Sequence, residues 1–337
     1  MTSNMATADS GIDWRKLLAE NAIIPALLVF IVLAGIATGG RFLSPSNLTI
    51  ILFQSSVLGV LVLGQTLVML VAGIDLSIAA VAILAAVIMG AGGSERQIMM
   101  NFSGILPYLG FLPAILIAIA GAALAGLING LVVVKLRIPA FIATLAMSLA
   151  LSGLAMLATG GSPVHYPDPF YESFGQTKFL GLPMPIYMFL ALSLGLGLYL
   201  SRSKLSVQLY ATGGNPRAAA LSGIPVSRIT ILAYTASGLL GGIAGFLFLA
   251  RTGSVAPHSG GNLLLETIAA VVIGGVSLAG GKGNVLNAFA GTLLLVGLSN
   301  LMNILLISPH LQDAVSGIII VVAIMANTRL QDAPAGQ

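Results

Sequence analysis

Six polar side chains stand inside or beside the long apolar stretches of this chain, and they are its best candidates for chemistry. Two are carboxylates and four are amides: Asp75, Glu266, Gln65, Asn129, Asn300 and Asn303. Such groups donate and accept hydrogen bonds, so a passage lined by them can distinguish hydroxylated solutes from analogues that lack the hydroxyl. The same groups also hold membrane helices together, because amides bond between helices and carboxylates complement helix N-termini. From the sequence, both roles remain open for all six.

The two carboxylates lie at the starts of expected helices. Asp75 follows Gly73 in VAGIDLSIA, and an ionised Asp at the centre of a bilayer costs about 2.5–3.5 kcal/mol. We therefore expect Gly73 to interrupt one helix and Asp75 to cap the next, accepting backbone N–H groups at 76–78. A cap at a broken membrane helix can also line a solute path. Glu266 is expected near the outer face, where it complements a helix dipole or faces the path.

The sequence contains no arrangement typical of catalysis or metal binding. The chain has no cysteine and three histidines, and none of the histidines has metal-ligand spacing to another. The segment GGVSLAGGKGN at 274–284 has the glycines of a phosphate-binding loop but not its spacing, so it predicts a turn between helices. We therefore expect no catalytic residue, metal or cofactor on this chain. Its energy must come from a partner or a gradient.

The composition places these residues in a membrane. Hydrophobic residues make up 57% of the 337 and charged residues 7%, whereas soluble domains carry roughly 25% charged residues. Lipid requires backbone polar groups to be paired within the protein, as they are in helices, and 41 glycines suit close helix packing. The sequence predicts an all-α polytopic membrane protein in a lipid bilayer. The net charge of +4 says nothing about nucleic acid, and no nucleic-acid partner is expected.

Hydropathy predicts about ten membrane-spanning helices within a transmembrane domain of residues 21–328. The expected spans are 22–38, 51–72, 76–92, 111–134, 138–159, 184–201, 229–250, 264–280, 285–305 and 310–327. Placing both termini in the cytoplasm puts ten of the fourteen Lys and Arg residues inside, as the positive-inside rule favours. Residues 1–20 and 329–337 are then cytoplasmic tails. The Pro-rich loop 160–183 becomes an ordered cap on the outer face.

The inner loop 202–228 carries the signals of a short capped helix. Asn215 suits the N-cap, Pro216 suits the first helical position, and Gly223 suits a left-handed stop. Arg217 adds positive charge to the helix itself. A compact, cationic helix between membrane spans is placed to contact a separate soluble partner in the cytosol.

Four segments, which include the capped inner loop and the stretch around Asp75, share the pattern of a known family. They are GQTLVMLVAGIDLSIAA at 64–80, GLINGLVVVKLRIPAFIATLAM at 126–147, ATGGNPRAAALSGIPV at 211–226 and ETIAAVVIGGVSLAGGKGNVLNAFAGTLLL at 266–295. In this order they resemble the permease subunits of bacterial ATP-binding-cassette importers for simple sugars, the ribose-type permeases. One departure is Leu264, which stands where the family usually has an acidic residue two positions before Glu266.

The resemblance implies a ten-helix subunit of the bacterial inner membrane that pairs with a second copy, expected as a homodimer. It also implies a cytoplasmic ATPase, possibly a tandem one, that binds ATP and Mg²⁺, and a periplasmic or extracellular solute-binding protein. The ATPase-coupling element would comprise Gly213, Gly214, Asn215, Arg217, Ala219, Gly223 and Ile224. The expected function is import of a monosaccharide or related small polyol by alternating access, without chemistry on the permease.

Two other classes of transport protein remain open. A gradient-driven secondary transporter would use Asp75 and Glu266 as proton or sodium carriers, and a passive channel would need no energy source. Neither class requires the capped inner helix. That helix therefore favours the ATP-driven importer.

Overall fold

The computed structural model describes residues 22–93, 108–165 and 168–308, and seven residues further on. Those seven are residues 311, 312, 314, 315, 317, 318 and 325. The expected tails 1–20 and 329–337, and most of the expected span 310–327, lie outside the described residues. Within the described part, the chain is mainly helical and each strand has only two residues.

The helices follow one another along the chain with short connections. Those of the first half are α2 (Ile23–Ala37), the 3-10 helix η1 (Arg41–Leu43), α3 (Pro45–Leu70), α4 (Ile78–Gly92), α6 (Phe111–Lys135), α7 (Ala140–Thr159) and α8 (Pro169–Gln176). Those of the second half are α9 (Met184–Arg202), α10 (Lys204–Gly214), α11 (Pro216–Leu221), α12 (Val226–Thr252), α13 (Gly260–Ile273) and α14 (Val285–Ile304). The strands form two antiparallel pairs, β1 (Val164–His165) with β4 (Ser254–Val255), and β2 (Lys178–Phe179) with β3 (Leu182–Pro183).

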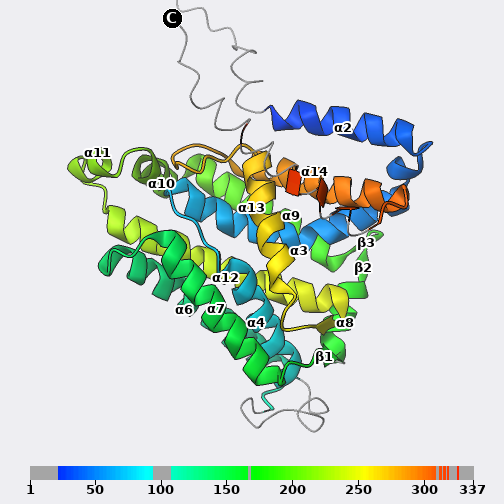
Figure 1. Ribbon diagram of the computed structural model, residues 1–337, viewed down its shortest axis with the longest axis horizontal. Helices are drawn as coiled ribbons and strands as arrows, with labels where there is room; N and C mark the ends of the chain where they lie inside the picture. The colour runs from blue at the N-terminus through cyan, green and yellow to red at the C-terminus, as the bar shows by residue number, and fades with distance from the viewer. Residues whose placement is uncertain are drawn as a thin grey trace, which may run out of the picture.

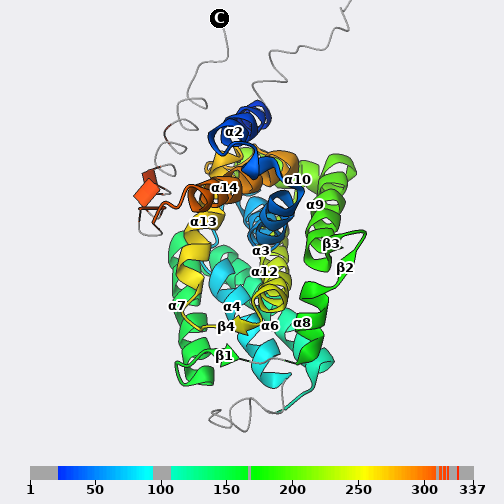
Figure 2. The ribbon, with the colours of Figure 1, turned by 90° about the vertical axis from the view of Figure 1, so that its right-hand side faces the viewer.

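Helices α3 and α12 form the centre of the bundle. Every residue of α3 from Ser55 to Leu70 is buried, and α12 packs against α3, α4 and α6. Helices α2 and α14 lie on one side of this centre, and α6 and α7 lie on the other (Figures 1 and 2). The contact of α12 with α6 depends on small residues, since a Cβ on Gly126 or Gly238 would overlap a backbone carbonyl of the other helix. Such close approach is typical of helix packing in lipid.

Each of the first nine expected spans falls on a helix of the structure. The clearest correction concerns the expected span 264–280, because α13 ends at Ile273. Gly275 adopts a left-handed φ of 77°, and the N–H groups of Gly275 and Val276 donate back into the last turn of α13. This is the hydrogen-bond pattern of a Schellman motif. Apolar residues continue past the break, so hydropathy alone places the end of the helix too late.

Six of the described helices are long and apolar enough to cross a membrane unaided: α3, α6, α7, α9, α12 and α14. Helices α2, α4 and α13 are apolar but shorter, and 14 or 15 residues span only about 21–23 Å of a hydrocarbon core about 30 Å thick. Helices α4 and α13 adjoin the irregular segments 71–77 and 274–284. The first segment is largely buried, and the second has buried, half-buried and exposed residues. Irregular backbone at membrane depth is tolerated where protein surrounds it. The protein is thus an all-α polytopic membrane protein.

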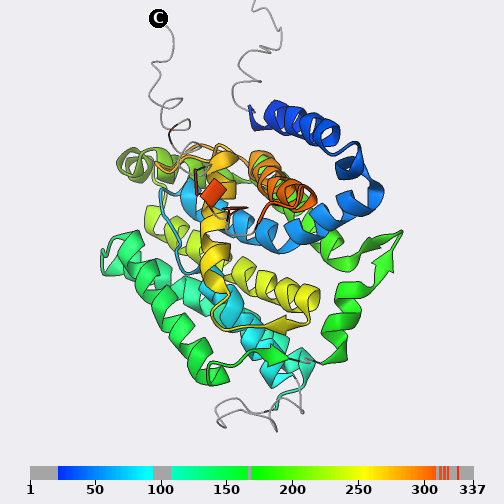
Figure 3. The same ribbon diagram turned by 45° about the vertical axis from the view of Figure 1, so that its right-hand side comes forward.

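The Pro-rich segment 160–183 is ordered where the structure describes it. Its helix α8 is fixed to the bundle because the Tyr171 hydroxyl donates to the Met89 carbonyl over 3.1 Å. Gly175 of α8 also packs directly on the backbone of Ala250 in α12. The segment and the exposed helix α11 lie at opposite ends of the bundle (Figures 1 and 3).

Candidate functional site

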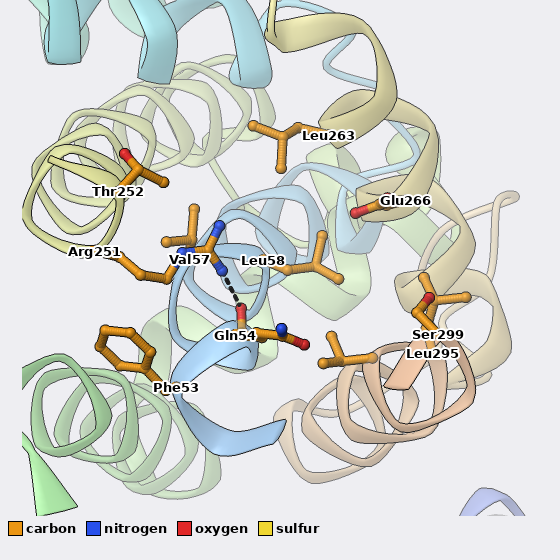
Figure 4. Close-up of a pocket in the computed structure, with 11 residues that line it drawn as sticks. Phe53, Gln54, Val57, Leu58, Arg251, Thr252, Leu263, Glu266, Leu295 and Ser299 are labelled. Atoms are coloured by element: carbon orange, nitrogen blue, oxygen red, sulfur yellow. Dashed lines mark hydrogen bonds between the residues drawn. The ribbon is translucent and has the colours of Figure 1, made fainter. Parts of the chain in front are cut away.

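A cavity of about 450 Å³ lies between α3, α12, α13 and α14 (Figure 4). All four helices contribute polar side chains to its lining: Gln54, Arg251, Thr252, Glu266 and Ser299. Phe53 and several Leu and Val side chains complete the wall. Small-molecule sites typically enclose roughly 300–1,000 Å³ within mostly apolar walls that carry a few polar groups. The cavity therefore has the size and lining of a site for a small polar solute.

Arg251 provides the cation of this cavity, and the sequence-based selection of candidates did not include it. Its Nη1 donates to the backbone carbonyl of Gln54 over 3.0 Å, and its guanidinium carbon lies 6.0 Å from the centre of the Phe248 ring. These contacts orient the guanidinium, which has further N–H donors to offer. Glu266, a predicted pathway residue, lines the same cavity from α13 (Figure 4). The available signal for Arg251 was a lone basic residue at the end of an apolar span.

Asp75 and Asn129, two other predicted pathway residues, lie together in a buried polar network. The Asp75 Oδ1 accepts hydrogen bonds from the Ser77 N–H (2.9 Å) and the Ser77 hydroxyl (2.6 Å). The Ser237 hydroxyl on α12 donates to the Asp75 Oδ2 over 2.8 Å. The Asn129 Nδ2 on α6 donates to the Ser77 Oγ over 2.8 Å. The network thus ties the irregular segment 71–77 to two neighbouring helices.

The break between α3 and α4 differs in detail from the expectation. Helix α3 ends at Leu70, before Gly73, and Ala72 has a left-handed conformation with a φ of 58°. Gly73 is required by packing, because a Cβ there would lie 2.6 Å from the Tyr234 hydroxyl. Asp75 accepts the Ser77 N–H as expected, but Ser77 itself occupies the N-cap position of α4.

Gln65 is wholly buried in the C-terminal part of α3. Neither its amide oxygen nor its amide nitrogen has a hydrogen-bond partner in the structure. Leaving a buried polar group unpaired costs about 1–3 kcal/mol. Gln65 is therefore destabilising in this conformation, unlike the paired carboxylate of Asp75.

The remaining two amides lie near one end of α14. Asn300 exchanges two hydrogen bonds with Asn47 of α3, at 2.9 and 3.0 Å, and so links the two helices. Asn303 accepts from the side-chain amide of Gln312 over 2.9 Å. Neither amide lines the cavity.

The short helix that the sequence predicts between α10 and α12 is confirmed as α11. The Asn215 Oδ1 accepts from the Ala218 N–H over 3.0 Å, and Pro216 is the first helical residue. At the other end, Gly223 has a φ of 81°, and the N–H groups of Gly223 and Ile224 complete a Schellman motif. The helix projects from the bundle with Ala219 as its one buried residue. Arg217 is exposed on it, and Leu221 is 91% exposed at its end.

Helix α10 connects α11 to the membrane helices through a contact of three segments, which we call the joint: residues 70–72, 210–214 and 280–283. Gly213 packs against the Leu70 carbonyl and the Gly281 N–H so closely that a Cβ would overlap the Leu70 oxygen. The Gly281 N–H donates to that same carbonyl over 3.0 Å. The Tyr210 hydroxyl donates to the Gly283 carbonyl over 2.7 Å. Gly214, the next coupling candidate, is exposed, and a Cβ there would meet no neighbour.

Comparisons with known proteins support the resemblance seen in the sequence. Residues 47–324 match the family model described as branched-chain amino acid transport system / permease component. The ribose import permease protein RbsC of Escherichia coli K12 is 37% identical over 321 residues, which cover 93% of this chain and 95% of that protein. RbsC of Bacillus subtilis is 33% identical, with 97% and 98% covered. The fructose import permease protein FrcC of Rhizobium meliloti is 33% identical, with 88% and 82% covered. There is no match among the solved structures.

These relatives are permease proteins of import systems, and they match this chain over most of its length. The six long apolar helices agree with a multi-pass protein of the bacterial inner membrane. The chain therefore belongs to the permease subunits of bacterial ATP-binding-cassette importers, in the ribose-type family that its four sequence segments resemble.

Proposed function

We propose that this chain is the membrane-spanning subunit of an ATP-driven importer that moves a monosaccharide or related small polyol by alternating access. The observation that carries the proposal is the exposed, capped helix α11, which is connected through the joint to α3 and to the segment between α13 and α14. The relatives add support, since their names include import of ribose and of fructose.

In this proposal about ten helices cross the membrane, both termini are cytoplasmic, and the loop 202–228 faces the cytosol. The loop 160–183 then lies on the outer face, where a solute-binding protein delivers the substrate. The ATPase, with its ATP and Mg²⁺, binds α11 from inside. The exposed side chain of Leu221 offers an apolar contact, and Arg217 and Asn215 complete the surface. A second copy of the chain pairs with the first, as a homodimer.

The cavity supplies the substrate contacts of the proposed passage. Arg251 donates, Glu266 accepts, and the Gln54 and Ser299 side chains can do either. Hydroxyl groups of a sugar also donate and accept, so they can satisfy these groups, whereas a deoxy analogue leaves one unpaired. The contacts are few, which suits a passage that must release its cargo.

The joint provides the proposed route from ATP to the cavity. Movement of α11 displaces α10, and α10 contacts the end of α3 at Leu70 and the loop at Gly281–Gly283. That loop connects α13 to α14, and α3, α13 and α14 form three of the four cavity walls. The contacts form a contiguous chain of packed backbone and hydrogen bonds. An inward push at α11 would therefore move those walls relative to one another.

The gradient-driven alternative receives less support from the site. Asp75, one of its two proposed ion carriers, already accepts three hydrogen bonds within the buried network and does not line the cavity. Of the two carboxylates only Glu266 lies at the cavity.

Uptake by vesicles tests the proposal. Vesicles that contain the chain with its ATPase and solute-binding protein should accumulate ribose or fructose with ATP, and a protonophore should not prevent it. The double variant Asn215→Ala/Gly223→Ala loses an N-cap, at a cost of about 1 kcal/mol, and places a Cβ at a left-handed position, at about 1–2 kcal/mol. Because α11 should then lose its fixed shape, this variant should hydrolyse ATP with little uptake.

A matched control makes the same two kinds of change at the opposite end of the bundle. Asp168 caps α8 through the Phe170 N–H, and Gly181 has a φ of 86°. The Asp168→Ala/Gly181→Ala variant should keep the normal number of sugars moved per ATP. Uptake that is indifferent to ATP and abolished by the protonophore would instead establish the gradient-driven class.

A further inference from the structure

Gln65 leaves a complete amide group unpaired in the C-terminal part of α3. A primary amide has two N–H donors and two acceptor positions, so Gln65 leaves more hydrogen-bonding capacity unused than a buried hydroxyl does. Buried side-chain polar atoms in native proteins nearly always have a partner, and an exception requires an explanation. A hydrogen-bond partner that reaches Gln65 only in a different conformation of the protein would provide that explanation.

The position of Gln65 indicates which partner that is. Residues Leu58, Val62, Gln65 and Met69 are spaced by four, three and four, so they share one face of α3. The three apolar members pack in one cluster with residues of α13 and α14, among them Val271. Leu58 also lines the cavity. The seven residues from Leu58 to Gln65 correspond to about 10 Å along the helix axis. Gln65 therefore lies beyond the cavity, toward the joint.

A second buried polar side chain belongs to the facing part of this cluster. Thr292 of α14 is wholly buried and lies between Ala288 and Val296, two members of the cluster, at helical spacing. Its hydroxyl donates to the Ala288 carbonyl over 2.9 Å, and its oxygen can still accept a hydrogen bond. Both α3 and α14 thus carry a polar side chain within an otherwise apolar contact.

We infer that the passage continues from the cavity along the Leu58–Met69 face of α3, and that Gln65 binds the hydroxyl groups of a neutral, polyhydroxylated solute there. The inference rests on the proposed function, because it takes the cavity as the upper part of the passage. In the present conformation the apolar cluster closes this part. The joint contacts both the end of α3 and the loop between α13 and α14, so its movement separates the two faces and exposes Gln65 to the substrate.

Thiol accessibility tests whether this face opens. The chain has no cysteine, so each introduced cysteine is unique within it. In the assembled transporter, the Gln65→Cys and Val62→Cys variants should resist a small hydrophilic methanethiosulfonate reagent at rest and react with it during ATP turnover. The control is Ser193→Cys in α9, at a buried hydroxyl that also lacks a partner but lies beside Phe189 and Leu196 of the other core cluster. It should not react in either state.

Labelling of both test positions at rest, or of neither position during turnover, would overturn the inference. The first result would mean that the face is not closed, and the second that it does not open.

A substitution of similar length tests the binding role of Gln65. The Gln65→Met variant removes the unpaired amide, so its thermal unfolding midpoint should rise by a few degrees. Its uptake of ribose or fructose should nevertheless fall about tenfold or more, because a hydroxyl-binding group is lost. The Ser193→Ala variant should be at least as stable as the wild type and have wild-type uptake. If Gln65→Met also has wild-type uptake, the inference fails while the proposed function stands. If the wild-type assembly shows no ATP-dependent sugar uptake, the proposed function itself fails.

Discussion

The Gly213→Ala variant is expected to lose most of its ATP-driven uptake while the bundle remains folded. The added Cβ would overlap the Leu70 carbonyl oxygen and lie 2.6 Å from the Gly281 nitrogen. Because these are backbone atoms, α10 must move away, and the hydrogen bond from Gly281 to Leu70 is disturbed. Overpacking of this kind costs about 1–3 kcal/mol. A shift of that size in the equilibrium between two conformations changes their ratio roughly 5–150-fold. Uptake and ATP hydrolysis, measured together in vesicles, would show the loss of coupling.

The neighbouring glycine provides a matched control for this prediction. Gly214→Ala adds the same methyl group one residue later, where no atom lies within 4 Å of the new Cβ. Gly214 does not have a left-handed conformation, so this variant should transport normally. If the Gly213→Ala variant takes up sugar as well as the Gly214→Ala variant does, the joint does not transmit movement.

The Asp75→Ala variant is expected to be severely destabilised. Its carboxylate accepts from the Ser77 N–H, the Ser77 hydroxyl and the Ser237 hydroxyl, and all three donors would lose this partner. An unpaired buried donor costs about 1–3 kcal/mol, so the variant should lose about 3 kcal/mol or more. The segment between α3 and α4 would lose the hydrogen bond that Ser237 of α12 donates to it. Thermal unfolding of the purified protein in detergent measures the effect.

An amide at the same position separates a structural role from ion transport. Asp75→Asn keeps an acceptor for Ser77, and its amide can donate to the Ser237 hydroxyl, so this variant should be much more stable than Asp75→Ala. Because asparagine cannot carry a proton, retained ATP-driven uptake in Asp75→Asn fits the importer. Uptake that is lost in a well-folded Asp75→Asn variant would favour an ion-carrying role.

The sequence predicts the local elements of this protein well. The first nine expected spans fall on helices, because long apolar runs have few alternatives in lipid. The structure of α11 follows from Asn215, Pro216 and Gly223, since each acts locally: Asn215 through its capping side chain, and Pro216 and Gly223 through their backbone conformations. The end of α13 was placed too late because hydropathy does not register a turn made of small apolar residues.

Features that depend on several distant segments were not visible in the sequence. The network of Asp75 joins α6 and α12 to the break after α3, and hydropathy gives no register between helices. The cavity role of Arg251 depends on the position of α3, whose Gln54 carbonyl orients it. Gly73 was expected to interrupt the helix, but its close packing against Tyr234 and the left-handed conformation of Ala72 depend on contacts that the sequence does not show. The joint requires three segments to meet, and two of them contain glycines at the contact.

The side of the membrane on which α11 lies decides the central claim. Leu221 is 91% exposed, so a Leu221→Cys variant of this cysteine-free chain should react wherever a membrane-impermeant maleimide can reach it. We expect no labelling in intact cells, rapid labelling after the membrane is permeabilised, and protection when the ATPase is bound. Labelling of the Leu221→Cys variant from outside intact cells would contradict the account.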